Sequence, residues 1–155
     1  MKVKQTKDYE LLAKLNKPVH DLHHSLYPEY FEEYDYDVIK DTFKNQIDKD
    51  NFIFLILEDE GEAVGFAWVE IRDYDRYPYK DTYQSVYVHQ ISINSEKRHS
   101  GYGTFLMDHI YQIAKDHNID LVELDYWVKN SNAAKFYQKH GFELFREMVF
   151  KKLEK

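Results

Sequence analysis

The chain has 155 residues, of which 43% are hydrophobic, and this is enough for one substantial core, so a single domain over residues 1–155 is expected. A formal net charge of −7 disfavours binding to nucleic acid and favours a cationic substrate. The lack of cysteine excludes disulfide frameworks, thiolate zinc sites and cysteine nucleophiles. No signal peptide and no long apolar run is found, so we expect a cytoplasmic protein that does not bind membranes.

The N-terminal third is expected to be helical. Apolar residues recur at helical spacing over residues 9–15, and Pro18 is expected to interrupt this helix because proline has no N–H to donate. The same spacing over residues 19–26 predicts another short helix, which ends near Pro28. A further helix is predicted over residues 37–47.

Three strands are predicted in the middle of the chain. From residue 51 onward, two apolar runs rich in β-branched and aromatic residues are joined by residues 59–62, which predicts a β-hairpin. A tyrosine-rich loop over residues 74–79 follows. The run SVYVHQISIN, residues 85–94, then predicts a third long strand, and a polar turn ends it.

The second half alternates helices and strands. A long helix is predicted over residues 101–118, with Asn118 as its C-cap and with an apolar face made of Phe105, Leu106, His109, Ile110, Ile113 and Ala114. A strand is predicted over residues 119–128, a short helix over residues 130–141, and one or two terminal strands over residues 142–153.

This order of elements predicts the fold class. A strand, a helix and a strand in succession imply two parallel strands joined by a right-handed crossover, whereas the hairpin half is antiparallel. We therefore expect an α/β (α+β) protein with a mixed, mostly antiparallel sheet and helices on both faces.

The turn between the third strand and the long helix carries the first motif. Two glycines, Gly101 and Gly103, allow the backbone to approach a ligand closely, and the free N–H groups of the helix's first turn favour an anion. Such a turn binds phosphate oxygens, and Arg98 adds a cation at its edge. Neither GxGxxG nor GxxxxGK[ST] is present, which removes the basis for Rossmann and P-loop interpretations.

A second motif follows about thirty residues later, with the pattern N-x-x-A-x-x-F-Y-x-K-x-G-F from Asn130 to Phe142. In isolation this segment is explained by an N-cap, a core and a glycine C-cap. Together, the two motifs resemble motif A, [QR]-x-x-G-x-[GA], and motif B of the GNAT N-acetyltransferase superfamily. The resemblance covers residues 50–150 well and the N-terminal third only in layout.

The resemblance implies an acetyl-CoA-dependent N-acetyltransferase and its cosubstrate site. Two central parallel strands are expected to splay apart and to hold the pantetheine arm, while the turn holds the pyrophosphate. Tyr137 is expected to act as the general acid toward the leaving thiolate. The residues expected to bind acetyl-CoA are Ile91, Ser92, Ile93, Arg98, His99, Ser100, Gly101, Tyr102, Gly103, Thr104, Asn130, Ala133 and Tyr137.

The general base departs from the family pattern. Histone acetyltransferases of the family carry a Glu on the strand before motif A, and the ungapped register from Gly101 places Tyr87 there. His89 lies two residues further on and is expected to share a strand face with Tyr87, Ile91 and Ile93. Its pKa range suits proton transfer near neutral pH, and a chain of water molecules is the alternative.

The acceptor amine is not identified by the sequence. In the family the N-terminal segment forms one wall of the acceptor pocket, so Tyr27, Tyr30 and the loop over residues 74–79 are expected to shape it. Further expected pocket residues are Tyr87, Asp125 and Trp127. The run HDLHH, residues 20–24, is not HExxH and has no second cluster, so no metal is expected. Acidic residues 29–37 could attract a cationic amine, but a solvated surface is the simpler explanation.

Two other classes of function stay open. One is an acyl-CoA-binding sensor without turnover, made plausible by the missing Glu, and the other is a phosphate-binding interaction domain. An exposed strand could also support a homodimer.

Overall fold

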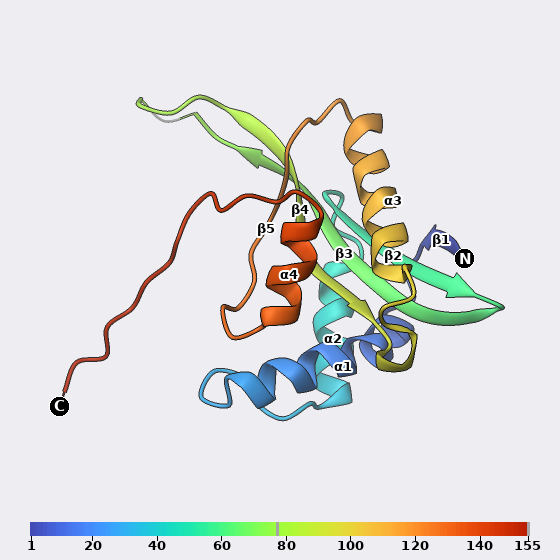
Figure 1. Ribbon diagram of the computed structural model, residues 1–155. Coiled ribbons are helices and arrows are strands. Elements are labelled where there is room, and N and C mark those ends of the chain that lie inside the picture. Colours follow the sequence, from blue (N-terminus) through green and yellow to red (C-terminus); the bar gives the residue numbers. More distant parts are fainter. Residues whose placement is uncertain (77, 155) are drawn as a thin grey trace. The chain divides into compact units, whose positions relative to one another are not determined.

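The computed structural model describes residues 1–76 and 78–154 (Figure 1), so Tyr77, within the predicted loop 74–79, lies outside the described residues. The chain forms two compact units, Met1–Asp125 and Tyr126–Lys155. No helix in the described part of the chain is both long enough and apolar enough to cross a membrane.

The first unit contains a five-stranded sheet with the strand order β1-β2-β3-β4-β5. The pairs β1–β2, β2–β3 and β3–β4 are antiparallel, and β4–β5 is parallel, which confirms the mixed, mostly antiparallel sheet. Its strands are β1 (Lys2–Gln5), β2 (Phe52–Asp59), β3 (Glu62–Tyr74), β4 (Tyr83–Ile93) and β5 (Val122–Leu124).

Three α-helices belong to this unit and one to the second. They are α1 (Tyr9–Leu26), α2 (Tyr36–Gln46), α3 (Tyr102–Asp116) and α4 (Ser131–Lys139), with a short 3-10 helix, η1 (Ser95–Lys97), before α3. The helix predicted over residues 37–47 is confirmed, and Asn118, with φ of 55°, adopts the left-handed conformation just after α3.

Pro18 does not interrupt the first helix, so the prediction of two short helices was wrong. Proline inside a helix costs about 3 kcal/mol because it removes a hydrogen bond and crowds the preceding turn. The apolar stripe of α1 runs through both halves, since Leu12 and Leu15 before Pro18 and Val19 after it pack in the same cluster. We infer that this packing offsets the local cost.

The core cluster joins α1 and α2 to one face of the sheet. Phe43 of α2 contacts Phe54, Phe66 and Trp68 of β2 and β3 edge-to-face, with ring centroids 5.9 to 6.0 Å apart. The side chains that alternate with these along β2 and β3, such as the fully buried Ala67, lie on the opposite face of the sheet. Helix α3 contacts β3 and β4, and Figure 1 shows it across the sheet from α1 and α2.

The last part of the chain departs from the prediction. Residues 142–154 form no strand, although one or two were predicted for residues 142–153, and the strand predicted over residues 119–128 is limited to Val122–Leu124. The apolar residues are present, but a strand also needs a neighbouring backbone to bond to. Figure 1 shows this segment as a trace that continues beyond α4.

Gly65 fixes the close approach of β3 to the end of β4. A Cβ at this position would lie 2.6 Å from the Ser92 carbonyl oxygen and 2.6 Å from Ile93 Cδ1. Because one of these atoms belongs to the backbone, a side chain here would push the two strands apart.

We expect Gly65→Ala to lower the free energy of unfolding by about 1–3 kcal/mol, the usual cost of inserting a methyl group into a packed site. Urea denaturation followed by circular dichroism measures it. Glu62→Ala, an exposed change at the start of the same strand, is the control and should stay within about 0.5 kcal/mol of the parent. Equal stability of the two variants would contradict the close approach.

Candidate functional site

The turn before α3 has the backbone geometry of an anion site. His99 has a φ of 63° and Gly101 a φ of 84°, so two residues of the turn are left-handed. A Cβ added at Gly101 would meet nothing within 4 Å, which leaves open space beside this backbone. Tyr102 anchors the turn, because its hydroxyl donates to Asp59 Oδ2 at the β2–β3 hairpin (2.7 Å).

The N-terminus of α3 has no side-chain cap. Asp8, Asp35 and Asn130 each accept backbone N–H groups at the start of α1, α2 and α4, whereas Gly101 provides no such acceptor and no acidic residue lies in the first turn of α3. The N–H groups of Tyr102 and Gly103, at the start of this first turn, have no acceptor within the helix. With the positive end of the helix dipole they favour a negatively charged ligand.

A cavity of about 560 Å³ adjoins this turn and is lined by cationic side chains from two elements. Lys14 and Lys17 come from α1, and Arg98 comes from the turn. Lys17 is paired with Asp21 (2.5 Å), whereas Lys14 and Arg98 form no ion pair with any described residue. Arg98 Nε also donates to the carbonyl of Ile93 (3.2 Å), which fixes the base of the side chain against the end of β4. Asp21 also lines the cavity, so its attraction for phosphate groups comes mainly from Lys14 and Arg98.

Strand β4 extends well beyond its pairing with β5. The parallel pairing joins only Val86–Val88 to Val122–Leu124, although β4 continues to Ile93. Asn94 N–H donates to the Val64 carbonyl on β3 (2.9 Å), and backbone groups alternate in direction along a strand. The N–H groups of Ile91 and Ile93 therefore point toward the open side, as expected for a splayed pair, whereas those of Ser92 point to β3.

His89 is the extra residue of a β-bulge at this point. The β3–β4 register passes from Trp68–Gln90 to Val69–Val88, so no β3 residue stands opposite His89. Its ring stacks on Trp68, with centroids 4.6 Å apart, and its Nε2 lies 2.7 Å from Glu70 Oε2.

The bulge corrects one expectation about faces. His89 lies on the same face as Tyr87, whose ring it contacts at 5.0 Å, as expected. It also shares that face with Gln90, which accepts a hydrogen bond from Asn16 of α1 (2.8 Å), and not with Ile91 or Ile93. The extra residue reverses the alternation, so strict period-two counting fails beyond His89.

Glu70 is a functional candidate that the sequence analysis missed. It stands directly opposite Tyr87 in the β3–β4 register, and it binds both His89 and Arg72, whose Nη2 donates to Oε2 at 2.7 Å. The neighbouring strand thus brings a carboxylate directly opposite Tyr87. In the sequence, Glu70 stands out only as a carboxylate within an otherwise apolar run of β3. Its partners can be identified only from the strand register.

The protonation states of this pair follow from their surroundings. Burial acts to raise the pKa of Glu70, but hydrogen bonds from Arg72 and His89 outweigh it and leave the pKa below its ordinary value. Burial lowers the pKa of His89, although the bond to Glu70 acts in the opposite direction. Near neutral pH the carboxylate is therefore charged and the imidazole neutral. In that state Nε2–H donates to Glu70, which leaves Nδ1 as a base.

Tyr87 and Asp125 form the next contact along the sheet. The Tyr87 hydroxyl donates to Asp125 Oδ2 (2.5 Å), and the Arg72 guanidinium lies 3.6 Å from the centre of the Tyr87 ring. Burial, followed by the bond to Asp125, raises the pKa of Tyr87 to about 12. Tyr87 is thus a hydrogen-bond donor near neutral pH and not a base.

Two other residues that were expected to line the pocket, Tyr27 and Tyr30, lie close to each other after α1. Tyr27 follows α1 directly and its ring lies 6.4 Å from that of Tyr30, which is exposed. Two histidines of HDLHH donate to carbonyls of the following loop, His20 to Glu32 (2.9 Å) and His24 to Phe31 (2.6 Å). These histidines hold the loop against α1.

The second motif forms a capped helix in the second unit. Asn130 Oδ1 accepts the N–H of Ala133 (3.1 Å), Asn130 N–H donates to the carbonyl of Trp127, and Gly141, with φ of 79°, lies just beyond the helix. Tyr137 is buried, with its ring 5.9 Å from Tyr126. The capping explanation of this motif is confirmed, and the contacts of Asn130, Ala133 and Tyr137 with acetyl-CoA stay predictions.

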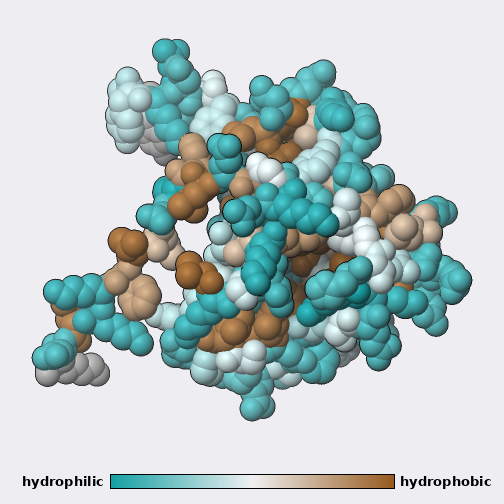
Figure 2. Space-filling view, in the orientation of Figure 1, coloured by the Kyte–Doolittle hydropathy of each residue, from teal (hydrophilic) through white to brown (hydrophobic). Residues whose placement is uncertain are grey.

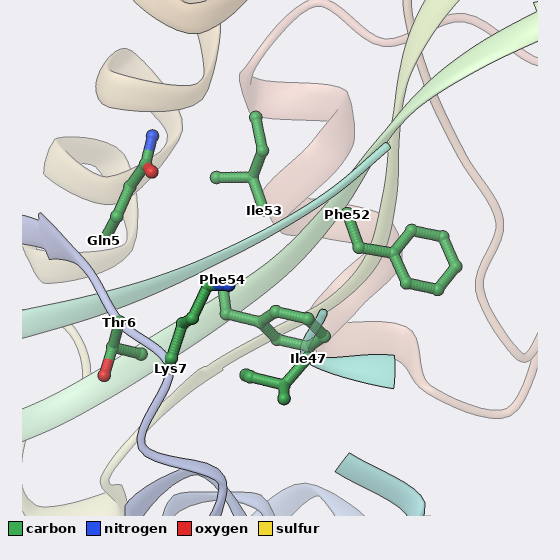
Figure 3. Close-up of a pocket in the computed structure, with 7 residues that line it drawn as sticks. All are labelled: Gln5, Thr6, Lys7, Ile47, Phe52, Ile53 and Phe54. Carbon is green, nitrogen blue, oxygen red and sulfur yellow. The ribbon is translucent and has the colours of Figure 1, made fainter. Parts of the chain in front are cut away.

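A separate small pocket lies beside β1 and β2 (Figure 3). Its volume is about 180 Å³, and Figure 3 shows the ring of Phe54 beside Ile47. Its one charged lining residue, Lys7, is paired with Asp48 (2.8 Å). It contains none of the features described for the turn or for His89, so we assign it no role.

Comparison with known proteins gives a match over most of the chain. The model of the acetyltransferase (GNAT) family matches residues 16–142. The chain is 35% identical over 72 residues to the probable N-acetyltransferase san of Drosophila melanogaster, covering 44% of this chain and 39% of that protein. It is 29% identical over 101 residues to an uncharacterized N-acetyltransferase of Methanocaldococcus jannaschii, covering 65% and 43%. The matches thus span about two fifths of these relatives' length.

Solved structures share the fold. A tetramutant of the BH1408 protein from Bacillus halodurans superposes with a TM-score of 0.92 at 20% identity, covering 99% of this chain and 100% of that one. An aminoglycoside N-acetyltransferase in complex with CoA superposes with a TM-score of 0.71 at 20% identity, covering 98% and 93%. At these identities the comparison shows a common fold.

We expect the pKa of His89, followed by NMR of its ring protons, to lie below 6.5. In Glu70→Gln it should fall further, because the charge and hydrogen bond that favour the imidazolium are lost. His89→Gln assigns the resonance among the eight histidines. A pKa above 6.5, or a rise in Glu70→Gln, would refute the described pair.

Proposed function

Because the chain belongs to the acetyltransferase (GNAT) family, we propose that it transfers the acetyl group of acetyl-CoA to an amine. The single observation that carries this proposal is that the first unit combines an uncapped, glycine-containing helix start with an unpaired edge on β4. One feature suits phosphate oxygens, and the other suits the amide groups of a pantetheine arm.

The binding half of the proposal uses the turn before α3, the cations beside it and the end of β4. The turn from His99 to Thr104 would hold the pyrophosphate, and Lys14, Lys17 and Arg98 would neutralise phosphate charge. The open side of Ile91 and Ile93 would bond the pantetheine amides, which places the thioester near the bulge. Acetyl-CoA supplies an acetyl group already activated as a thioester.

The chemical half depends on removing a proton from the amine. An alkyl ammonium with a pKa of about 10 costs roughly 4 kcal/mol to deprotonate near neutral pH. In this proposal His89 Nδ1 accepts that proton, and Glu70, which lies 2.7 Å from Nε2, orients the ring and stabilises the imidazolium that results. Glu70 is thus a positioning residue for His89.

The transfer itself needs no covalent enzyme intermediate. The amine nitrogen, which has lost one proton to His89, forms a bond to the acetyl carbon, and the carbon–sulfur bond breaks. The second amine proton, released as the amide forms, replaces the proton that Tyr137 gives to the thiolate. The backbone N–H of Ile93 would stabilise the negative charge that develops on the thioester oxygen. Tyr137 keeps its predicted role as the proton donor to the leaving thiolate.

The acceptor side favours a cationic amine. Asp125 and Glu123 stand at the end of β5, bonded to the hydroxyl groups of Tyr87 and Tyr74. These carboxylates and the net charge of −7 attract a positively charged substrate. An acyl-CoA sensor without turnover was favoured by the missing Glu at Tyr87, and that support weakens because Glu70 lies opposite.

We expect acetyl-CoA to bind in calorimetric titration in preference to ATP and NAD, and Gly101→Val to weaken this binding at least about tenfold, since the side chain would fill the open space that a phosphate needs. Gly61→Val is the matched control, because Gly61 has a similar φ of 86° and open surroundings but lies in the β2–β3 hairpin, outside the turn that would hold the phosphates. Equal losses in both variants would trace the effect to backbone strain and contradict the placement.

We expect His89→Gln to lower kcat/KM for an accepted amine about 100-fold without changing acetyl-CoA affinity, as loss of a general base does. Thiol release over a range of pH measures this. In the parent, activity should rise with pH as His89 loses its proton, with the acidic limb below pH 6.5 because burial lowers this pKa.

The control for this experiment is His109→Gln on α3, which should keep both rate and pH profile. An unchanged limb in His89→Gln would remove His89 as the base. Acetyl-CoA binding with no turnover of any amine would favour the sensor.

A further inference from the structure

The hairpin between β3 and β4 carries a pair of stacked tyrosines at some distance from His89. Tyr74, the last residue of β3, stands directly opposite Tyr83, the first residue of β4. Their rings are nearly parallel, with an interplanar angle of 13° and centroids 4.2 Å apart. Figure 1 shows this hairpin extending beyond the other strands of the sheet, and its tip, at the upper left of Figure 2, is teal and pale, which indicates a polar surface.

An ammonium group of the chain itself lies beside this tyrosine pair. Lys80 Nζ is 5.6 Å from the centre of the Tyr74 ring and 5.2 Å from that of Tyr83. Aromatic rings attract a cation within about 6 Å of their centres. The tyrosine pair therefore already holds one positive charge, supplied by a neighbouring residue of the hairpin.

Two carboxylates of the β5 region lie between the level of the tyrosine pair and that of His89. Glu123 stands opposite Tyr87 in the parallel β4–β5 register, and Asp125 follows two residues later. Glu123 Oε2 accepts the hydroxyl of Tyr74 (2.8 Å), and Asp125 Oδ2 accepts that of Tyr87 (2.5 Å). The surface from His89 to the tyrosine pair thus carries negative charge along its length, which favours a cationic ligand.

Arg72 lies among these residues and has the same sign of charge as such a ligand. Its Nη2 donates to Glu70 Oε2 (2.7 Å), and its guanidinium lies 3.6 Å from the centre of the Tyr87 ring. The charge of Arg72 is therefore compensated within the sheet.

Ser85 is a second feature that indicates a cationic ligand at the pair. It is fully buried on the strand face between Tyr83 and Tyr87, and its hydroxyl has no hydrogen-bond partner in the described part of the chain. Because Tyr74 belongs to β3 and its hydroxyl reaches Glu123 on β5, its side chain crosses β4 over Ser85. An unpaired buried hydroxyl is costly, and an ammonium group that entered beside Tyr74 would donate to its oxygen.

Resting on the proposed acetyl transfer to an amine, we propose that the Tyr74–Tyr83 pair binds a second ammonium group of an elongated acceptor, and that Lys80 occupies this site while no acceptor is bound. Tyr83 precedes His89 by six positions on β4, which is about 18 Å of extended strand. The acceptor class is therefore a linear diamine or polyamine whose terminal amines lie about that far apart. A short amine reaches His89 but not the pair.

The values of kcat/KM for linear α,ω-diamines of increasing length, each compared with the monoamine of the same length, test this subsite. The ratio of diamine to monoamine should rise to about tenfold at the length that joins His89 to the tyrosine pair, as expected for attraction between a cation and aromatic rings. Short diamines should show a ratio near unity. A ratio near unity at every length, with monoamines acetylated, would overturn the subsite and leave the proposed transfer intact. No acetylation of any amine would instead remove the function on which the subsite rests.

Two variants separate the rings from their internal ligand. Tyr83→Leu should bring the ratio for long diamines close to unity, because one ring of the pair is lost. Lys80→Met should raise kcat/KM for long diamines at least about threefold, because no internal cation competes. Lys44→Met is the matched control, since it removes a similar lysine–tyrosine contact, 5.9 Å from the Tyr9 ring, outside the hairpin. Circular dichroism confirms folding, and an unchanged ratio in Tyr83→Leu or a fall in Lys80→Met would contradict the site.

Discussion

The extra residue at His89 is the structural constraint on which the candidate site depends. The pairing of β4 with β5 ends at Val88, and the bulge begins at the next residue. Beyond it, the N–H groups of Ile91 and Ile93 point away from β3, on the side where β5 no longer pairs, while the His89 side chain turns toward Glu70. One inserted residue thus brings an unpaired strand edge and a possible base to the same point of the sheet. Gly65 makes this possible by letting β3 follow β4 closely past the bulge.

The charged and polar side chains around the bulge form one connected network, in which each member influences the protonation of the next. Arg72 binds Glu70 and keeps its carboxylate charged despite burial. The charged carboxylate then fixes which nitrogen of His89 carries the proton, while burial of the ring keeps the histidine neutral. Tyr87 covers Arg72 with its ring and donates to Asp125. Loss of any member would change the protonation of its neighbours.

Local sequence patterns correctly predicted the elements whose formation depends only on nearby residues. Gly101 and Gly103 before an amphipathic helix, and Asn130 at the start of α4, require no knowledge of distant residues, and these elements form as expected. The partner of His89 could not be predicted, because Glu70 becomes its neighbour only through strand register and a bulge that period-two counting cannot reveal. The predicted terminal strands failed for a related reason, since apolar alternation supplies a face but no bonding partner.

Amide NMR of the labelled protein, titrated with CoA, tests most directly whether the open edge and the turn form one binding site. Shifts are expected at Ile91 and Ile93 and at the first turn of α3, all saturating at one CoA concentration. The amides around the small pocket at Phe54 should stay unchanged. Shifts confined to that pocket, or a turn that responds while the β4 edge does not, would contradict the account.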